Sequence, residues 1–596
     1  MTDVLSVAEH GLIGDLRTCA LVGSDGTIDW FCAPRFDSPS VFGAILDPQR
    51  GGSWQVTTAC EDSRTHQFYF PQSAALITRF LTDDGVIEVH DFMPVLRPKD
   101  ETHTQRLVRR VVAVRGATTV RMVLDARPDY GRQRFDVQHD GRTARFTVDE
   151  LVMRLDSSVD LDVEGTVVSA EFELRTGQTA EFVLAVGDHI PDDATDVDAL
   201  FDATIHFWRS WLKNSRYQGR WREMVERSAI TLKLLTHEPS GAIIAAPTTS
   251  LPEDIGGERN WDYRYVWMRD AGFSLYALLA LGFNDEARAF ITWLSQRLGR
   301  GDREEDGLGP LRVLYDIDGN EPPPEAALDH LRGHLDSTPV RIGNAAVGQL
   351  QLDIYGDLID SVYLFNKYGP GISYDAWSDV VFVVDWLIDN WERDDAGMWE
   401  VRDAEKPHTT SRLMCWVALE RAIRIARHRG LPADLVRWSA ARDAIYHRIM
   451  TKSWNSDREA FTQVEGGDRL DAGVLLMPMV KFISPADPRF LSTLAAVERE
   501  LVTDSLVFRY QPATDGLDGD EGTFSLCTFW YVEALTRCGR LADAQLALEK
   551  MFTYANHVGL YAEQVSATGD QVGNFPQAFT HLSLISAAIN LDRALG

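Results

Sequence analysis

Cysteine is scarce in this chain, with six in 596 residues, and none of them forms a CxxC pair or a Cys/His cluster with zinc spacing. The pattern indicates scattered, reduced thiols and favours a cytoplasmic protein. The first residues, MTDVLSVAEHGLIGDLRT, lack a basic region followed by an apolar core, so the sequence predicts no signal peptide. Long apolar runs are also missing, because the run 380–387 is interrupted by Asp385 and is far too short to span a membrane.

Basic side chains are in deficit as well: 59 Lys and Arg stand against 89 Asp and Glu, which gives a formal net charge of −30. Such a surface repels phosphate backbones and anionic lipids, so the sequence predicts neither a nucleic-acid partner nor a membrane partner. A neutral substrate such as a sugar suits this balance better than an anionic substrate does. Much of the charge is explained by solubility alone, so it excludes partners without specifying chemistry.

Several common catalytic motifs are missing too. The chain contains no Walker A loop, no HExxH, no GxSxG elbow and no strand-linked GxGxxG. No group of residues suggests a metal site, and no motif suggests a cofactor. Acid–base chemistry by carboxylates requires neither and is the natural remaining candidate.

Residues 1–195 have the pattern of an antiparallel β-sandwich domain. Apolar runs on either side of residues 24–26 predict a hairpin, and residues 168–175 alternate between apolar and polar side chains. Many short segments of this kind, separated by Gly or Asp-Gly turns, are typical of a two-sheet sandwich. Residues 196–218 follow as a predicted linker helix that carries Trp208 and Trp211.

From residue 219 to the C-terminus the apolar side chains recur with helical spacing. Successive steps of four, three, four and three residues place one set on a single helix face: Trp377, Val381, Val384, Ile388 and Trp391. We expect about twelve helical segments here, and twelve helices with functional loops suggest a catalytic (α/α)6 barrel over residues 219–596. Periodicity alone equally allows an irregular helical bundle.

Four segments of the helical part combine Trp, Arg and acidic residues in predicted loops, namely residues 260–270, 397–402, 508–510 and 559–564. Sugars present hydroxyl groups to charged side chains and C–H faces to indole rings, so this composition suits a sugar-binding pocket. The alternative interpretation places the tryptophans in the core and the acids at helix caps. Each segment taken singly fits both interpretations.

At these segments the sequence resembles glycoside hydrolase family 15, which contains glucoamylases, glucodextranases and bacterial trehalases. The resemblance extends over nearly the whole chain, and residues 11–18 and 29–42 are similar to the β-sandwich of bacterial trehalase-like members. It implies a β-sandwich, a linker helix and a catalytic (α/α)6 barrel. It also implies an inverting mechanism that uses two glutamates.

The resemblance assigns the catalytic roles to Glu400 and Glu563. Glu400 follows Trp399 and matches the family's general acid, while Glu563, in an Ala-Glu-Gln sequence, matches the general base. The acid must be protonated when it acts, which favours a desolvated site beside Trp399, and the base must be ionised. Inversion requires the two carboxyl groups to lie roughly 6.5–9.5 Å apart. Glu521 is a rival for the base, although an acid there also suits the start of the helix expected near Phe524.

The resemblance also implies a set of sugar-binding residues. Trp267, Arg269 and Asp270 match the family's Trp-x-Arg-Asp motif, in which the Arg and the Asp hold hydroxyl groups of the sugar at subsite −1. Arg509, which precedes Tyr510, matches a further sugar-binding arginine. Together with Trp399 and Tyr510, these residues complete the predicted binding site for the glucose at subsite −1.

One departure separates this chain from fungal glucoamylases: Val401 stands where those relatives have a second glutamate after the acid. That glutamate helps to hold the leaving sugar, so subsite +1 must differ here. His408 follows the acid by a short loop and is a candidate for the +1 site, although a single histidine is more often structural. The secondary candidates are Trp416, Gln351, Asp353, Asp262 and Arg264.

These features favour an inverting α-glucoside hydrolase, with α,α-trehalose as the leading substrate. The alternative is a glucoamylase-type or glucodextranase-type exo-glucosidase that acts on maltooligosaccharides or isomalto-linked glucans. A non-catalytic sugar-binding protein is the minor alternative. The expected partner is therefore a neutral glucoside, and the sequence is compatible with a homo-oligomer.

Overall fold

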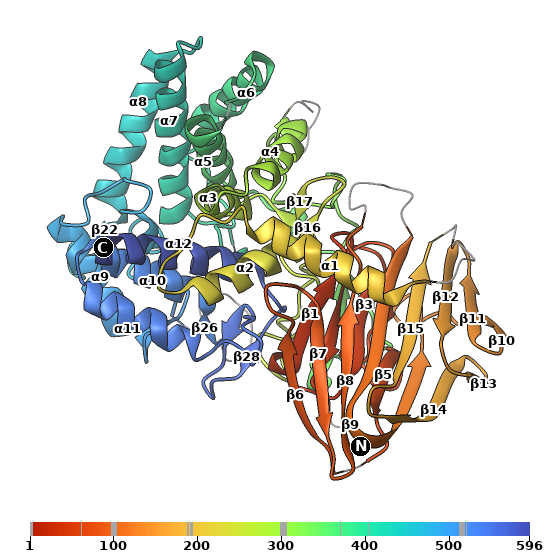
Figure 1. The fold of residues 1–596 in the computed structure, drawn as a ribbon. Coiled ribbons are helices and arrows are strands. Elements are labelled where there is room, and N and C mark those ends of the chain that lie inside the picture. The colour runs from red at the N-terminus through yellow and green to blue at the C-terminus, as the bar shows by residue number, and fades with distance from the viewer. Residues whose placement is uncertain are drawn as a thin grey trace.

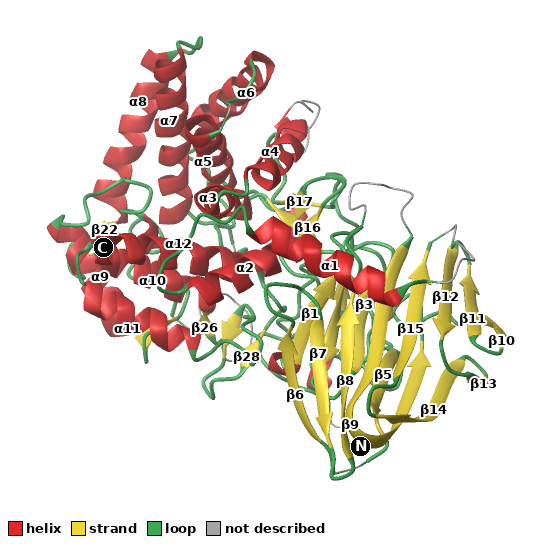
Figure 2. Ribbon diagram, viewed as in Figure 1, coloured by secondary structure: helices red, strands yellow, loops and turns green. Residues whose placement is uncertain are grey.

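The structure is a computed structural model that describes residues 4–60, 62–96, 104–187, 190, 195–298, 307–369, 371–402, 404–511, 519 and 521–596. Its N-terminal part consists of β-strands and its C-terminal part mainly of helices, with helix α1 (Val197–Leu212) at the junction (Figure 1). Colouring by secondary structure shows the same division (Figure 2). The predicted antiparallel β-structure and the predicted helical part are both confirmed.

The strands of the N-terminal part join into one antiparallel network of hydrogen bonds. They are β1 (His10–Gly14), β2 (Cys19–Gly23), β3 (Thr27–Cys32), β4 (Ser40–Phe42), β5 (Ser53–Thr58), β6 (Arg64–Tyr69), β7 (Leu76–Leu81), β8 (Gly85–Phe92), β9 (Gln105–Asp125), β10 (Asp136–Asp140), β11 (Thr143–Val148), β12 (Leu151–Ser157), β13 (Asp162–Glu164), β14 (Val167–Arg175) and β15 (Thr179–Val186). The first half of β9 pairs with β8 and β15, and its second half pairs with β5 and β14. Partners change near Gly116, whose φ of +74° suits glycine and where an added Cβ would collide with the carbonyl oxygen of Asp84.

The strands that pair with the first half of β9 and those that pair with its second half form two halves of the network, and both halves share one apolar core. Arg109 on β9 is completely buried and forms an ion pair with Asp91 on β8 at 2.8 Å. The same guanidinium donates to the backbone carbonyl of Trp54 on β5, which belongs to the other half. Buried charges are costly unless they are paired, so this arrangement holds the two halves together in one register.

The helical part begins with α1, where the side chain of Asp196 accepts a hydrogen bond from the N–H of Ala199 at 3.0 Å and caps the helix. The helices that follow are α2 (Arg222–Leu234), α3 (Asp270–Leu281), α4 (Asn284–Leu298), α5 (Asp353–Tyr368), α6 (Tyr374–Asn390), α7 (Thr409–Arg429), α8 (Leu435–Arg448), α9 (Pro488–Glu500), α10 (Ser525–Arg537), α11 (Leu541–Phe552) and α12 (Ala578–Leu595). Within the described ranges, no helix combines the length and apolar character that crossing a membrane requires.

Helices α3, α5, α7, α10 and α12 form an inner set together with the short 3-10 helix η6 (Ala472–Leu476). Each contacts the next in the order α3, α5, α7, η6, α10, α12, and α12 contacts α3, so the contacts close a ring. Helices α2, α4, α6, α8, α9 and α11 each pack against at least one member of that ring. Burial follows position: α12 is buried on all sides along most of its length, whereas α8 buries only Trp438 and Ile445.

The N-terminal part also contacts the loops between the helices. Trp30 on β3 donates from Nε1 to the carbonyl oxygen of Pro247 at 2.7 Å. Arg264 donates from Nη1 to the carbonyl oxygen of Ser38 at 2.9 Å and is held by Asp262 at 2.6 Å. Asp262 and Arg264, two of the secondary site candidates, thus pair with each other and are not among the described residues that line the pocket. The loop that carries Pro247 and Arg264 is anchored on the β-strand part.

Candidate active site

A pocket lies where helices α3, α10 and α12 begin, and the loops before them form its walls. Helix N-termini favour negative charge, so this location suits carboxylates. The empty space in the pocket is about 890 Å³, including its open mouth. Among the described residues, no three His, Cys, Asp or Glu side chains are grouped as metal ligands. The lining residues are Ala245, Glu253, Arg259, Trp261, Tyr263, Trp267, Arg269, Asp270, Asn344, Ala346, Gln349, Met398, Trp399, Glu400, Val401, Arg402, Arg509, Phe524, Leu526, Glu563, Gln577 and Phe579.

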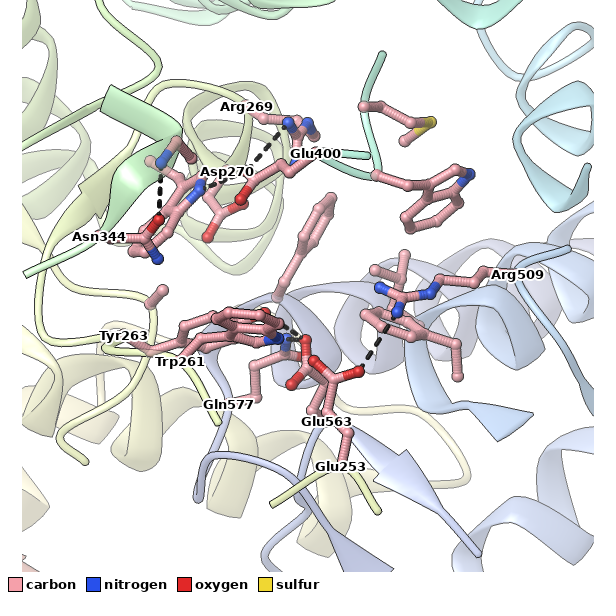
Figure 3. A pocket seen from close by; sticks show the side chains of 18 of the residues that line it. Glu253, Trp261, Tyr263, Arg269, Asp270, Asn344, Glu400, Arg509, Glu563 and Gln577 are labelled. Atoms are coloured by element: carbon pink, nitrogen blue, oxygen red, sulfur yellow. Dashed lines mark hydrogen bonds and ion pairs between the residues drawn. The ribbon is translucent and has the colours of Figure 1, made fainter. Parts of the chain in front are cut away.

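Glu400 lies on one wall of the pocket, with Arg269 beside it (Figure 3). Its Oε1 accepts a hydrogen bond from Trp267 Nε1 at 2.7 Å and lies 3.4 Å from Arg269 Nη2. Arg269 is itself held by an ion pair with Asp353 at 2.8 Å and by a hydrogen bond to Gln351. The side chain of Glu400 is 21% exposed, so a ligand in the pocket can reach it.

The backbone of Glu400 is in the left-handed region, with φ of +57°. For a residue other than glycine this conformation costs on the order of 1–3 kcal/mol, and such residues concentrate at active sites. The N–H of Glu400 donates to the carbonyl oxygen of Gly397 at 3.2 Å, which closes a tight turn. Gly397 packs on His408, because a Cβ at this position would lie 2.7 Å from His408 Cδ2. The turn holds the carboxyl group of Glu400 at the pocket wall.

Glu563 lies on the opposite wall and is completely buried (Figure 3). Its Oε1 accepts hydrogen bonds from the Tyr263 hydroxyl at 2.6 Å and from Gln577 Nε2 at 3.2 Å. Its Oε2 has no hydrogen-bond partner among the described residues. Burial raises the pKa of Glu563 well above its usual value, and the negative charge of Glu253 raises that pKa further. The raised pKa makes Glu563 a strong base in its ionised form.

Arg509 lies on the same side of the pocket as Glu563 (Figure 3). Its Nη2 lies 3.2 Å from Glu253 Oε2, and its Nε forms an ion pair with Glu521. The guanidinium carbon lies 5.1 Å from the ring centroid of Tyr510, which is buried behind the pocket wall. Glu521, the rival base, is thus a buried partner of Arg509 and is not among the described lining residues.

Asp270 and Trp399, two further predicted sugar contacts, also line the pocket. Burial raises the pKa of Asp270 to about 7, while the preceding arginine lowers it. Trp399 donates its indole N–H to Asp471 at 2.8 Å. The indole that hydrogen-bonds Glu400 is therefore that of Trp267, while Trp399 directly precedes Glu400 in the chain and lines the same pocket.

His408 and Trp416 are not among the described lining residues of the pocket. His408 is buried at the start of α7, and burial lowers its pKa to about 4, so it is neutral at pH 7. Its contact with Gly397 supports the turn that carries the acid. Trp416 packs against Phe482 with ring centroids 5.1 Å apart. His408 therefore supports the site from behind, whereas Trp416 belongs to the apolar core.

Three residues that act on the base were not apparent from the sequence: Tyr263 and Gln577, which donate hydrogen bonds to it, and Glu253, whose charge raises its pKa. Tyr263 lies four residues before Trp267, within the same Trp- and Arg-rich segment, and that position could have identified it. Glu253 and Gln577 carry no such signal, because they lie in loops that only the fold brings to Glu563.

The comparison with family models gives the class of the protein. Residues 219–547 and 540–589 match the model of Glycosyl hydrolases family 15, and residues 2–192 match the trehalase-like N-terminal domain. The chain belongs to glycosyl hydrolase family 15 and is a glycoside hydrolase. The pocket with its opposed glutamates and its Trp, Arg and Asp side chains lies within the matched region.

The particular relatives are trehalases. The chain is 36% identical to a trehalase of Mycolicibacterium smegmatis, over 99% of this chain and 91% of that protein. It is also 36% identical to a trehalase of Thermoplasma acidophilum, over 96% of this chain and 98% of that protein. A crystal structure of a bacterial glucoamylase complexed with acarbose matches with a TM-score of 0.75, over 99% of this chain and 94% of that chain. At 16% identity that likeness shows the fold alone.

Proposed function

We propose that this protein is an inverting trehalase that hydrolyses α,α-trehalose to two glucose molecules, with Glu400 as general acid and Glu563 as general base. The observation that carries the proposal is that both glutamates line one pocket from opposite walls (Figure 3). The trehalases that align over nearly the whole chain support the choice of substrate.

The proposed reaction breaks the bond between C1 of the glucose at subsite −1 and the glycosidic oxygen. Glu400 gives its proton to that oxygen, and the second glucose leaves as an alcohol. Glu563 takes a proton from a water molecule on the opposite face of the ring, and the water oxygen forms the new bond to C1. The attacked glucose is released as the β anomer, while the leaving glucose keeps the α configuration.

We assign the water molecule to Oε2 of Glu563. Tyr263 and Gln577 both hold Oε1, so rotation of the carboxyl group would break two hydrogen bonds. Oε2 is left without a partner among the described residues and suits a water molecule. Because the pKa of Glu563 is raised, activity should fall as the pH drops through that pKa and the base becomes protonated.

The glucose at subsite −1 is assigned to Arg269, Asp270 and Arg509, all of which line the pocket. Two of these side chains are held in place by acids: Arg269 by Asp353, and Arg509 by Glu253. Charged groups that are already ordered lose little conformational entropy when a sugar binds, which favours a defined orientation of the ring.

Subsite +1 is assigned to the mouth of the pocket, beside Val401. The guanidinium carbons of Arg402 and Arg341 lie 4.1 Å and 4.6 Å from the ring centroid of Trp261. Glu325 pairs with both arginines, at 2.8 Å and 3.4 Å respectively. Trp261 and Arg402 of this braced cluster line the pocket, and we assign them to the boundary of a +1 site for a single leaving glucose.

The finer architecture is part of the same proposal: a β-sandwich over residues 1–195, a linker helix over 196–218 and a catalytic (α/α)6 barrel over 219–596. The closed ring of inner segments and the helices packed outside it support the barrel. In the described chain, the short η6 occupies the position of one inner helix.

The anomers of the fresh product test the proposed function. The purified protein is incubated with α,α-trehalose, and proton NMR spectra are recorded before mutarotation. We expect α- and β-glucose in equal amounts, and faster turnover of trehalose than of maltose, isomaltose or maltotriose. Fresh α-glucose alone would contradict inversion. Faster turnover of the other glucosides would favour the exo-glucosidase, and tight trehalose binding without turnover would favour a binding protein.

A further inference from the structure

A third glutamate of the pocket lining lies on the wall that carries the base. Glu253 lines the pocket beside Glu563, and its side chain is 2% exposed (Figure 3). Its Oε2 accepts a hydrogen bond from Gln564 Nε2 at 2.8 Å and lies 3.2 Å from Arg509 Nη2. Its Oε1 is buried and has no hydrogen-bond partner in the described part of the chain. A scheme with Glu400 and Glu563 alone leaves this buried acid without a role.

Hydrogen bonds connect Glu253 and its neighbour Pro252 to two residues beside Glu563, namely Gln564 and Gly573. Gln564, which donates to Glu253, directly follows the base in the chain. Pro252, which directly precedes Glu253, accepts a hydrogen bond from the N–H of Gly573 at 2.7 Å. Gly573 packs so closely against the base that a Cβ there would lie 2.9 Å from Glu563 Oε2. A shift of the Glu253 loop would therefore move both supports of the base.

The charges that face Glu563 do not balance. They come from Arg509 and from the carboxyl groups of Glu253 and Glu400, while the Tyr263 hydroxyl donates a hydrogen bond that lowers the pKa of Glu563. Arg509 is the single cation in this set and is already paired with Glu253. Carboxyl groups that share one cation compete for it, and the like charges favour proton binding.

We propose that Glu253 is a positioning residue for the base: it anchors Arg509 and Gln564, and its negative charge makes Glu563 a stronger proton acceptor. The inference rests on the proposed function, in which Glu563 is the general base. Glu253 acts through its neighbours and needs no contact with the sugar. A nearby opposite charge shifts the pKa of a carboxyl group by about 1–3 units, and a like charge shifts it in the other direction, so the effect expected of Glu253 is large enough to measure.

The test is the pH dependence of kcat/KM on trehalose, which reports the ionisation of the free enzyme. We assign the acid limb to Glu563, the group that must lose its proton. Asp270, with a pKa of about 7, is present in the wild type and in every variant, so a difference between them reports on Glu563. Glu253→Gln removes the neighbouring negative charge at nearly constant size, which lowers the pKa of Glu563. We expect the acid limb to move to lower pH by about 1–3 units and kcat at the optimum to fall, because Glu563 becomes a weaker base. Glu253→Asp keeps the charge and should leave the limb closer to that of the wild type.

Glu521→Gln is the matched control, because it removes the other acidic partner of Arg509 by the same chemical change. It should shift the acid limb less than Glu253→Gln does, since Glu521 is not among the main charges facing Glu563. Thermal unfolding checks that each variant is folded. The wild type provides a measurement that does not depend on any variant: its acid limb should lie well above about 4.3, the ordinary pKa of a glutamate.

Two results would overturn the inference while leaving trehalose hydrolysis intact. One is a wild-type acid limb at the ordinary glutamate value, and the other is an acid limb that does not move in Glu253→Gln. A lower kcat with an unmoved limb would give Glu253 a structural role only, and so would also reject the inference. A wild-type protein without turnover on any glucoside would instead reject the proposed function, and the inference with it.

Discussion

At the scale of single residues, one loop supplies a hydrogen-bond donor to each of the two proposed catalytic glutamates. Tyr263 donates to Glu563 and Trp267 donates to Glu400, at 2.6 Å and 2.7 Å. The two donors lie four residues apart, and their rings are 5.2 Å apart between centroids. Trp267 is further fixed by the short strand β18 (Val266–Trp267), which pairs with β19 (Leu314–Tyr315). One loop thus sets the positions of both carboxyl groups.

Glu400→Gln and Glu563→Gln should each lower kcat on trehalose by about 10²–10⁴-fold, the usual contribution of a general acid or base. Each replacement keeps the size of the side chain and can still accept a hydrogen bond from Trp267 or Tyr263, so the fold should persist. Steady-state kinetics give kcat, and thermal unfolding provides the control. A purified, folded variant that turns over at nearly the wild-type rate would disprove the role of that glutamate.

At the scale of elements, helix α6 shows where periodicity succeeds and where it fails. The apolar spacing correctly predicts the helix, but its buried face differs from the predicted stripe, since Val381 and Ile388 are only partly buried. The reason is that α6 contacts α4, α5 and α7 together, and these neighbours determine which face is covered. The buried residues of the helix are Trp377, Val380, Val383, Val384 and Leu387.

The turns on either side of β28 (Gln571–Val572) give a prediction at the same scale. Gly573 and Gly569 both have positive φ, +83° and +90°, so alanine at either site should lower the free energy of unfolding by about 1–2 kcal/mol. Only Gly573→Ala should also lower kcat, because its Cβ would lie 2.9 Å from Glu563 Oε2. At Gly569 the nearest atom is 3.7 Å away, on Tyr554, so Gly569→Ala is the matched control. Equal kcat values for the two variants would show that Gly573 does not position the base.

At the scale of the whole molecule, the β-strand part supports the catalytic loops. One continuous apolar core includes residues of the strands, of α1 and of the helical ring. Hydrogen bonds from Trp30 to Pro247 and from Arg264 to Ser38 anchor the segment that leads to Tyr263. The described cysteines are all free thiols, and the cytoplasmic location and the homo-oligomer stay predictions from the sequence.

Trp30→Phe tests this support, because it removes the buried donor to Pro247 without touching the pocket. We expect a lower Tm together with a lower kcat on trehalose, since the catalytic loop loses its anchor on the β-strand part. Trp54→Phe is the control: Trp54 is equally buried, but its Nε1 has no hydrogen-bond partner among the described residues. It should lower Tm and leave kcat unchanged. If both variants keep the wild-type kcat, the β-strand part does not support the site through Trp30.

The sequence by itself determined which part of the chain forms strands and which part forms helices, and it identified most of the predicted site. Hairpin turns, period-two strands and helical spacing are local properties, so they could be recognised without the fold. Trp267, Arg269, Asp270 and Glu400 stand in short, dense motifs, and the resemblance to the family identified them for the same reason. The structure brings these residues and Glu563 to one pocket.

Only the tertiary structure decided which side chains hold or influence each glutamate. Tyr263 and Glu563 are 300 residues apart in the chain, and Glu253 and Gln564 are 311 apart. Contacts across such distances depend on how the ring closes and on how loops rest on the β-strand part, and neither leaves a periodic pattern in the sequence. The buried acid Glu253, the shifted face of α6 and the placement of His408 behind the pocket wall were for this reason decided by packing.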